Sequence, residues 1–293
     1  MSDDIKIIKS NPSLTGMAEV INDVVFSNAG GCKLKMQIIL PWRSENNTLL
    51  YPAVVFVQGS GWTFPNVWYE VPQLCRLASR GYVVASVTHR NSLEGHPFPD
   101  CLKDVKTAIR FLRKNAGMYG IDEKRICIWG TSSGGNLALL TAMTSGDERY
   151  ISDEYREYSD NVVCCTACFP TTDFVECMES QDFDKGLKEV FVALSGGTVD
   201  KNMTVLKEIS PYYIAKKCIE NNISADYPPI FLAHGTNDTL IPYSQSEKMY
   251  YSLKKLGVNV SMTAVENAPH EGAFWSEEML QMIFEFIERY CEE

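Results

Sequence analysis

The sequence predicts an α/β fold with a mostly parallel central sheet of about eight strands, helices on both faces and a small inserted lid. Short apolar segments rich in β-branched residues alternate with longer amphipathic segments, which is typical of parallel strands joined by crossover helices. Hydrophobic residues make up 45% of the chain and charged residues 22%, as in folded globular proteins. Because no repeat, low-complexity tract or linker interrupts the pattern, we expect a single domain over residues 1–293.

Eight segments have the composition of strands, and the first two should form an antiparallel hairpin at one edge. The turn-forming run Asn28-Ala29-Gly30-Gly31 joins those two segments. The expected strands are Asp23–Ser27, Lys33–Leu40, Ala53–Gly59, Val83–Thr88, Arg125–Gly130, Val162–Phe169, Ile230–Gly235 and Val258–Val265.

Five longer segments show helical periodicity. In the second of them, Leu102, Val105 and Ile109 recur at the spacing of one helix face. The expected helices are Trp68–Ser79, Pro99–Asn115, Ser133–Ser145, Tyr243–Leu256 and Ser276–Cys291. The segment of about residues 174–226 interrupts the alternation, which indicates an inserted lid or substrate-pocket region, although a plain surface insertion fits nearly as well.

Charge and hydropathy disfavour nucleic acid and membrane as partners. The 27 basic and 37 acidic side chains give a net charge of −10, and no run of Lys or Arg exceeds two residues. The longest apolar runs, Ala53–Val57 and Val190–Leu194, are far shorter than the roughly 20 residues that cross a bilayer. Since the start of the chain carries Asp3 and Asp4 and no long apolar core, we expect a cytoplasmic protein unless a leader has been removed.

The ten cysteines are best interpreted as reduced core thiols, because most of them lie in apolar surroundings and a chain of this length does not need disulfides. Cys165 and Cys168 form a single C-x-x-C pair with no second Cys or His pair nearby. We therefore expect no metal site.

One sequence motif indicates a catalytic serine. Gly130-Thr131-Ser132-Ser133-Gly134 reads G-x-S-x-G and lies between a predicted strand and an apolar helix. The turn must be sharp to lift the Ser132 hydroxyl above the sheet, and its glycines remove Cβ atoms that would collide with strand and helix. This context favours a nucleophilic serine over a glycine-rich turn that merely packs closely.

A serine nucleophile needs a base and a carboxylate that orients the base. His270 follows the last predicted strand, and Asp238 follows the strand that ends in His234-Gly235. The order Ser132, Asp238, His270 places each residue after a different strand, at the carboxyl edge of a parallel sheet. Asp173 is the competing acid, and we expect His234 to shape the acid-bearing loop.

An acyl-transfer site also needs hydrogen-bond donors for the oxyanion of the tetrahedral intermediate. The backbone N–H of Ser133 should be one, because it follows the nucleophile. The small residues of Gln58-Gly59-Ser60-Gly61-Trp62, after the third expected strand, allow a second loop to approach the substrate. An ordinary tight turn is the alternative for that loop.

The motifs QGSGW, GTSSGG, HGTND with LIP, and HEG, in this order, resemble the α/β-hydrolase family, in the esterase and lipase branch that includes small acetyl and feruloyl esterases of carbohydrate-degrading systems. The resemblance spans about residues 24–290. It implies that Ser132 is the nucleophile, Asp238 the acid and His270 the base, and that Ser60, Gly61 and Ser133 are the oxyanion donors, with no cofactor required. Many members have HGGG where this chain has Gln58 for the His and Ser60 for the second Gly, and the backbone N–H of Ser60 can still donate.

The resemblance implies a small-molecule ester substrate with a short acyl or feruloyl group, and its carbohydrate-degrading members suggest a plant-derived oligosaccharide as the carrier. Aromatic residues follow the oxyanion loop and the base, and we expect Trp62, Trp68, Phe274 and Trp275 to contact the substrate, although core positions fit them about equally well. A serine peptidase for small peptides and a non-catalytic binding protein of the same fold remain as alternatives. The sequence leaves the oligomeric state open.

Overall fold

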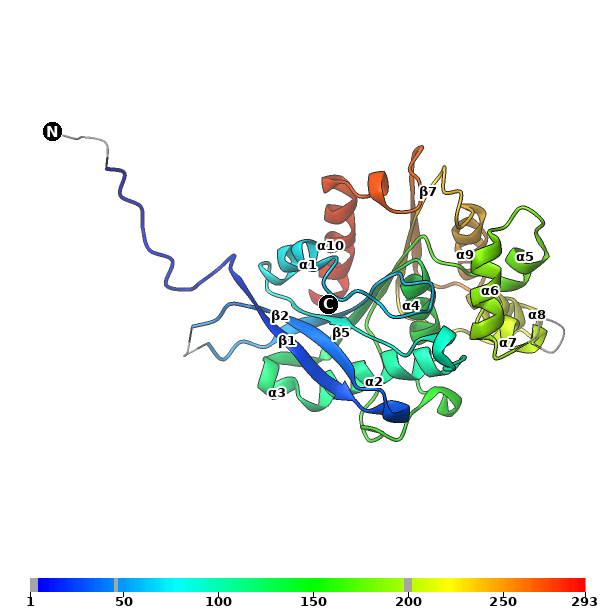
Figure 1. Cartoon of the computed structure of the whole chain (residues 1–293). Helices are drawn as coiled ribbons and strands as arrows, with labels where there is room; N and C mark the ends of the chain where they lie inside the picture. The colour runs from blue at the N-terminus through cyan, green and yellow to red at the C-terminus, as the bar shows by residue number, and fades with distance from the viewer. Residues whose placement is uncertain (1–4, 45–46, 198–201, 293) are drawn as a thin grey trace.

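The computed structural model describes residues 5–44, 47–197 and 202–292. The strands form one sheet with the order β1-β2-β4-β3-β5-β6-β7-β8, and neighbours from β4 to β8 run parallel, whereas β2 is antiparallel to β1 and β4 (Figure 1). The strands are β1 Ala18–Ser27, β2 Leu34–Pro41, β3 Tyr51–Val57, β4 Val83–Val87, β5 Ile121–Thr131, β6 Cys165–Cys168, β7 Ile230–Gly235 and β8 Val260–Val265. The predicted fold class and the edge hairpin are confirmed.

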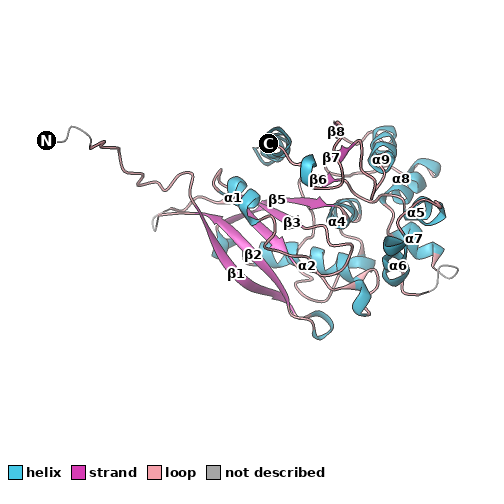
Figure 2. Cartoon of the chain, turned by 45° about the horizontal axis from the view of Figure 1, so that its top comes forward, coloured by secondary structure: helices cyan, strands magenta, loops and turns pink. Residues whose placement is uncertain are grey.

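Helices cover both faces of this sheet, as Figure 2 shows. Successive residues of β3 alternate between two hydrophobic clusters, because side chains of a strand point to opposite faces. One cluster includes residues of α1 and α10, and the other includes residues of α2, α4 and α9. The five predicted helices are found as α1 Val71–Ala78, α2 Asp100–Lys114, α4 Ser133–Met143, α9 Ser244–Lys255 and α10 Glu277–Glu292, with a short α3 at Ala116–Tyr119.

The segment between β6 and β7 is an insertion of short helices, grouped on one side of the molecule in Figure 1. Its helices are α5 Phe174–Glu179, α6 Lys185–Leu194, α7 Met203–Glu208 and α8 Pro211–Glu220. Residues 198–201 of the predicted insertion lie outside the described residues.

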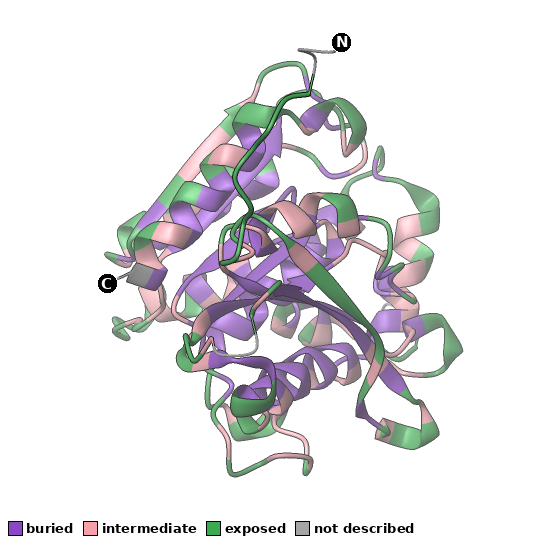
Figure 3. Cartoon of the chain, turned by 90° about the vertical axis from the view of Figure 1, so that its left-hand side faces the viewer, coloured by how far each residue is buried: buried purple, intermediate pink, exposed green. Residues whose placement is uncertain are grey.

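Strands β1, β5 and β6 differ most from their predicted bounds, and β5 begins at Ile121 rather than at Arg125. Strand β1 begins five residues earlier, at Ala18, because an irregularity in its pairing with β2 at Asp23, where φ is 56°, lets the ladder continue. Strand β6 is only four residues long, since its pairing with β7 ends at Cys168. Figure 3 shows that β1 and the chain before it are mostly exposed, and in Figure 1 that preceding segment extends away from the folded body.

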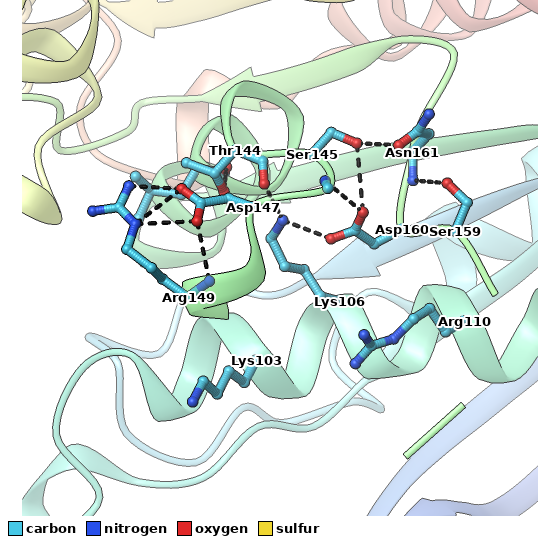
Figure 4. Close-up of polar contacts among 12 residues, drawn as sticks. Lys103, Lys106, Arg110, Thr144, Ser145, Asp147, Arg149, Ser159, Asp160 and Asn161 are labelled. Carbon is cyan, nitrogen blue, oxygen red and sulfur yellow. Dashed lines mark hydrogen bonds and ion pairs between the residues drawn. The ribbon is translucent and has the colours of Figure 1, made fainter. Parts of the chain in front are cut away.

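A buried ion pair holds the far end of α4. Lys106, on α2, donates to Asp160 Oδ2 at 2.7 Å and to the Thr144 carbonyl at 2.5 Å, and Asp160 also accepts from the Gly146 N–H (Figure 4). Neither side chain of the pair is more than 3% exposed. Burial lowers the pKa of Lys106, and the opposing charge of Asp160 counteracts this effect.

Replacing Lys106 with methionine should lower the free energy of unfolding by about 3–5 kcal/mol, because it leaves a buried carboxylate without its cation. Denaturant titration of purified protein measures this change. The matched control is Lys216→Met, which removes an exposed pair with Glu220 and should cost less than about 1 kcal/mol. Equal losses in the two variants would contradict the prediction.

The described residues contain no helix that is long and apolar enough to span a bilayer. Seven of the ten cysteines are buried. The described residues also hold no cluster of three or more His, Cys, Asp or Glu side chains arranged for a metal ion.

Candidate active site

Ser132 lies on a strained turn between β5 and α4. Its backbone has φ 53° and ψ −121°, a conformation that is rare for residues other than glycine. A Cβ atom on Gly130 would lie 2.1 Å from the Gly134 carbonyl oxygen, and one on Gly134 would lie 1.9 Å from that of Val57. The two glycines of the motif are therefore required by close backbone packing, as expected from the sequence.

The structure brings Ser132, His270 and Asp238 together. His270 Nε2 lies 3.0 Å from Ser132 Oγ, and His270 Nδ1 lies 2.7 Å from Asp238 Oδ2. An ionised carboxylate can only accept a hydrogen bond, so the neutral imidazole must carry its proton on Nδ1, which faces Asp238. Its Nε2 is then free to accept the proton of the Ser132 hydroxyl. The arrangement can therefore deprotonate the hydroxyl as it attacks an electrophile.

Asp238 is held by four hydrogen bonds. Its Oδ1 accepts from the backbone N–H groups of Leu240 and Ile241, each at 2.9 Å, and its Oδ2 accepts from His270 and, at 3.1 Å, from His234 Nε2. Burial alone would raise the pKa of Asp238, but the hydrogen bonds from His234 and His270 outweigh it and hold the pKa well below its usual range. The carboxyl group is thus ionised at any pH at which the protein would work.

His234 positions Asp238. Its Nε2 also donates to the Ile241 carbonyl at 2.9 Å, and its Nδ1 accepts from the Ser246 hydroxyl at 2.7 Å. Both nitrogens of this buried ring are therefore occupied within the acid-bearing loop and α9. The expectation that His234 shapes this loop agrees with the geometry.

The competing acid Asp173 has a different environment. Its Oδ1 caps α5 by accepting from the Glu176 N–H at 3.0 Å, and its Oδ2 pairs with Lys248 Nζ at 2.9 Å. Asp238, and not Asp173, contacts His270.

The oxyanion loop departs from the prediction at Ser60. Its N–H donates to Ser133 Oγ at 2.8 Å, and the N–H of Gly59 donates to Thr131 Oγ1 at 2.8 Å. The Ser60 N–H is therefore already engaged, because two hydroxyls of the serine turn hold this loop in place. Among the described residues, none accepts a hydrogen bond from the N–H of Gly61 or Ser133, so both remain available to an oxyanion.

Two of the four predicted substrate-contacting aromatics are buried, which corrects that prediction. Trp62 is only 2% exposed and packs on Phe174 and Phe191 of the insertion, at ring distances of 5.1 and 5.4 Å. Phe274 is fully buried against Phe169. Trp68 is 47% exposed and Trp275 is partly buried, so these two remain candidates for substrate contact.

Sequence reasoning did not single out Asn136, which joins three parts of the site. Its Oδ1 accepts from Trp62 Nε1 at 3.1 Å, and its Nδ2 donates to the carbonyls of Thr171 and Ile209 at 3.1 and 3.0 Å. The sequence does place this amide alone near the start of an otherwise apolar helix. A polar side chain buried there requires hydrogen-bond partners, so this position could have indicated a structural role.

A cavity of about 660 Å³ lies away from Ser132, Asp238 and His270, between the end of α4 and the helices α7 and α8. Its walls include Thr144, Arg149, Lys207 and Tyr213, and none of Ser132, Asp238 and His270 lines it.

Comparison with known proteins identifies the family to which this chain belongs. The family model BD-FAE matches residues 36–253. The probable carboxylic ester hydrolase LipM of Mycobacterium tuberculosis is 29% identical over 73% of this chain and 48% of its own length, so the chain spans about half the length of the curated relatives it matches.

Solved structures show the same architecture over nearly the whole chain. Est2 of Thermogutta terrifontis with propionate bound is 25% identical, with a TM-score of 0.72 over 95% of this chain and 96% of that one. A bifunctional GH43-CE protein of Bacteroides eggerthii is 28% identical, with a TM-score of 0.79 over 94% of this chain and 35% of that one. The chain therefore belongs to the BD-FAE family, in the esterase branch of the α/β hydrolases.

Proposed function

We propose that this protein is a serine-dependent carboxylic ester hydrolase with Ser132, His270 and Asp238 as its catalytic triad. The observation that carries the proposal is the continuous hydrogen-bonded chain from Ser132 Oγ through His270 to Asp238, on a strained turn at the carboxyl edge of the sheet. The relative LipM is named a probable carboxylic ester hydrolase, which supports the same reaction class.

The reaction has two steps. His270 Nε2 takes the proton of Ser132 as Oγ attacks the ester carbonyl, and the tetrahedral intermediate then expels the alcohol, which receives that proton from His270. Water repeats the sequence at the acyl-enzyme and releases the acid. Gly61 and Ser133 supply N–H groups to the oxyanion, while Asp238 holds the imidazole and stabilises its charged form.

The substrate we propose is a short acyl or feruloyl ester, carried on a plant-derived oligosaccharide. The Thermogutta terrifontis esterase with propionate bound supports the short acyl group. The insertion between β6 and β7 would act as the wall of the substrate pocket, since Phe174 and Phe191 pack directly on Trp62 of the oxyanion loop.

Hydrolysis of matched p-nitrophenyl acetate, butyrate and octanoate tests this function. We expect turnover that falls with chain length and that is lost in Ser132→Ala. Equal, slow release by both proteins would contradict the proposal. Serine-dependent cleavage of amide substrates alone would identify a peptidase, and no reaction with either substrate class would favour a binding protein.

A further inference from the structure

Outside the proposed active site, a cysteine, a histidine and a carboxylate lie in a row. Cys32 follows the short turn Ala29–Gly31 that joins β1 to β2 (Figure 1), and its Sγ lies 3.5 Å from Nε2 of His96. On the other side of the imidazole ring, Nδ1 of His96 lies 3.4 Å from Oδ2 of Asp100, at the start of α2. The fold thus brings the thiol to a base that is 64 residues away in the chain.

The groups around the imidazole are fixed by Arg90. Its Nη1 donates to Asp100 Oδ2 at 2.8 Å, and its Nη2 donates to Asp104 Oδ1 at 2.8 Å. A Cβ atom on Gly30 would lie 3.6 Å from Arg90 Nη1 and 3.7 Å from His96 Cε1, so the turn before the cysteine packs against both side chains. The ring is therefore held between this turn and a fixed carboxylate, whose negative charge stabilises the protonated imidazole.

The thiol lies at the surface of the protein. Cys32 is half-buried, and its neighbours Gly31 and Lys33 are exposed. The side chains of His96 and Asp100 are 21% and 28% exposed. A small reagent can therefore approach this site from solvent without the opening of the core.

The other nine cysteines differ from Cys32 in burial or in partner. Seven of them are buried. Cys75 is half-buried, and burial raises the pKa of its thiol, which makes the reactive thiolate scarcer. Cys218 is also half-buried, but its Sγ lies 3.5 Å from the hydroxyl of Tyr227, and a neutral phenol is a poor base. Within the described part of the chain, only Cys32 combines access from solvent with an imidazole partner.

We propose that Cys32 is a site of covalent modification, at which the thiol forms a mixed disulfide with a small-molecule disulfide and His96 acts as the base. The observation that carries the proposal is the row of Cys32 Sγ, the His96 ring and the Asp100 carboxylate at a surface turn. The inference does not depend on ester hydrolysis.

The exchange is balanced by one proton transfer in each direction. Because Nδ1 of His96 faces a carboxylate, the proton of the neutral ring is favoured on Nδ1, and Nε2 can take the proton of the Cys32 thiol. The thiolate attacks one sulfur of the disulfide, so that a new S–S bond forms to Cys32 while that of the small molecule breaks. The departing thiolate receives the proton from His96, and one half of the reagent leaves as a free thiol.

The test measures the reaction rate of each cysteine separately. The full-length protein is treated at pH 7 with bis(2-hydroxyethyl) disulfide and, in parallel, with iodoacetamide, and the modified peptides are quantified by mass spectrometry. Both reagents are uncharged, so the net charge of the protein does not steer them. We expect Cys32 to react with each reagent about 10-fold faster than Cys75 and Cys218.

Two variants separate the base from its surroundings. In His96→Gln, the amide keeps hydrogen-bonding groups beside the thiol but cannot take up a proton, so Cys32 should react about 10-fold more slowly. The matched control is Glu94→Gln, which removes an exposed charge from the same loop and should leave the rate of Cys32 unchanged. In urea-unfolded protein, Cys32 and Cys218 should react at similar rates, which would assign the difference to the fold rather than to the adjacent Lys33.

Two results would overturn the proposal. One is a rate for Cys32 in the folded protein that does not exceed that of Cys218. The other is an unchanged or higher rate for Cys32 in His96→Gln, which would mean that exposure alone makes the thiol reactive. If His96→Gln fails to fold, Asp100→Asn decides, because it removes the charge that stabilises the protonated imidazole. The rate of Cys32 should then fall about threefold, and an unchanged rate would contradict the role of His96 as the base.

Discussion

Alanine at position 132 should lower kcat for p-nitrophenyl acetate by about a million-fold, because it removes the proposed nucleophile, the Oγ that lies 3.0 Å from His270 Nε2. The fold should persist, since within the described part of the chain the Ser132 hydroxyl hydrogen-bonds only to His270. Steady-state kinetics, with a thermal unfolding curve for each protein, measures both effects.

The control for this variant is Ser252→Ala on α9, where the lost hydroxyl bonds only to the Lys248 carbonyl of its own helix. Its kcat should equal that of the wild-type protein. Activity retained in Ser132→Ala would remove the basis for the proposed mechanism.

Asparagine at position 238 should lower kcat about 10,000-fold with little change in overall structure. Asp238 Oδ2 accepts from both His270 Nδ1 and His234 Nε2, and an amide N–H at that point cannot accept from either. If the amide donates to His270 Nδ1, the imidazole proton moves to Nε2, where the ring can no longer take a proton from Ser132.

The matched control is Asp173→Asn, which removes one carboxylate from the pair with Lys248 but leaves His270 untouched. We expect its kcat to stay within about 10-fold of the wild-type value, because the proposed reaction does not use Asp173. A larger loss in Asp173→Asn than in Asp238→Asn would exchange the roles of the two residues.

The proximity of Ser132, Asp238 and His270 could be predicted because each lies at a position that local sequence defines. Glycines mark the turn at Ser132, and Asp238 and His270 follow strands whose apolar runs are clear. In a parallel sheet, strand ends meet at one edge, so three local predictions were enough to assemble the site.

The surroundings of the triad could not be predicted in the same way. Whether Trp62 faces solvent or core depends on Phe174 and Phe191, more than 110 residues away in the chain, and on the amide of Asn136. The engagement of the Ser60 N–H likewise depends on a hydroxyl 73 residues later.

The amide of Asn136 has a consequence for how the molecule fluctuates. It hydrogen-bonds simultaneously to Trp62 of the oxyanion loop, to Thr171 after β6 and to Ile209 within the insertion. Segments that share a buried hydrogen-bonding hub open together rather than one by one. A local opening that detaches the inserted helices would therefore also release the loop that carries the Gly61 N–H, and the protein would lose its pocket wall and part of its oxyanion site in the same event.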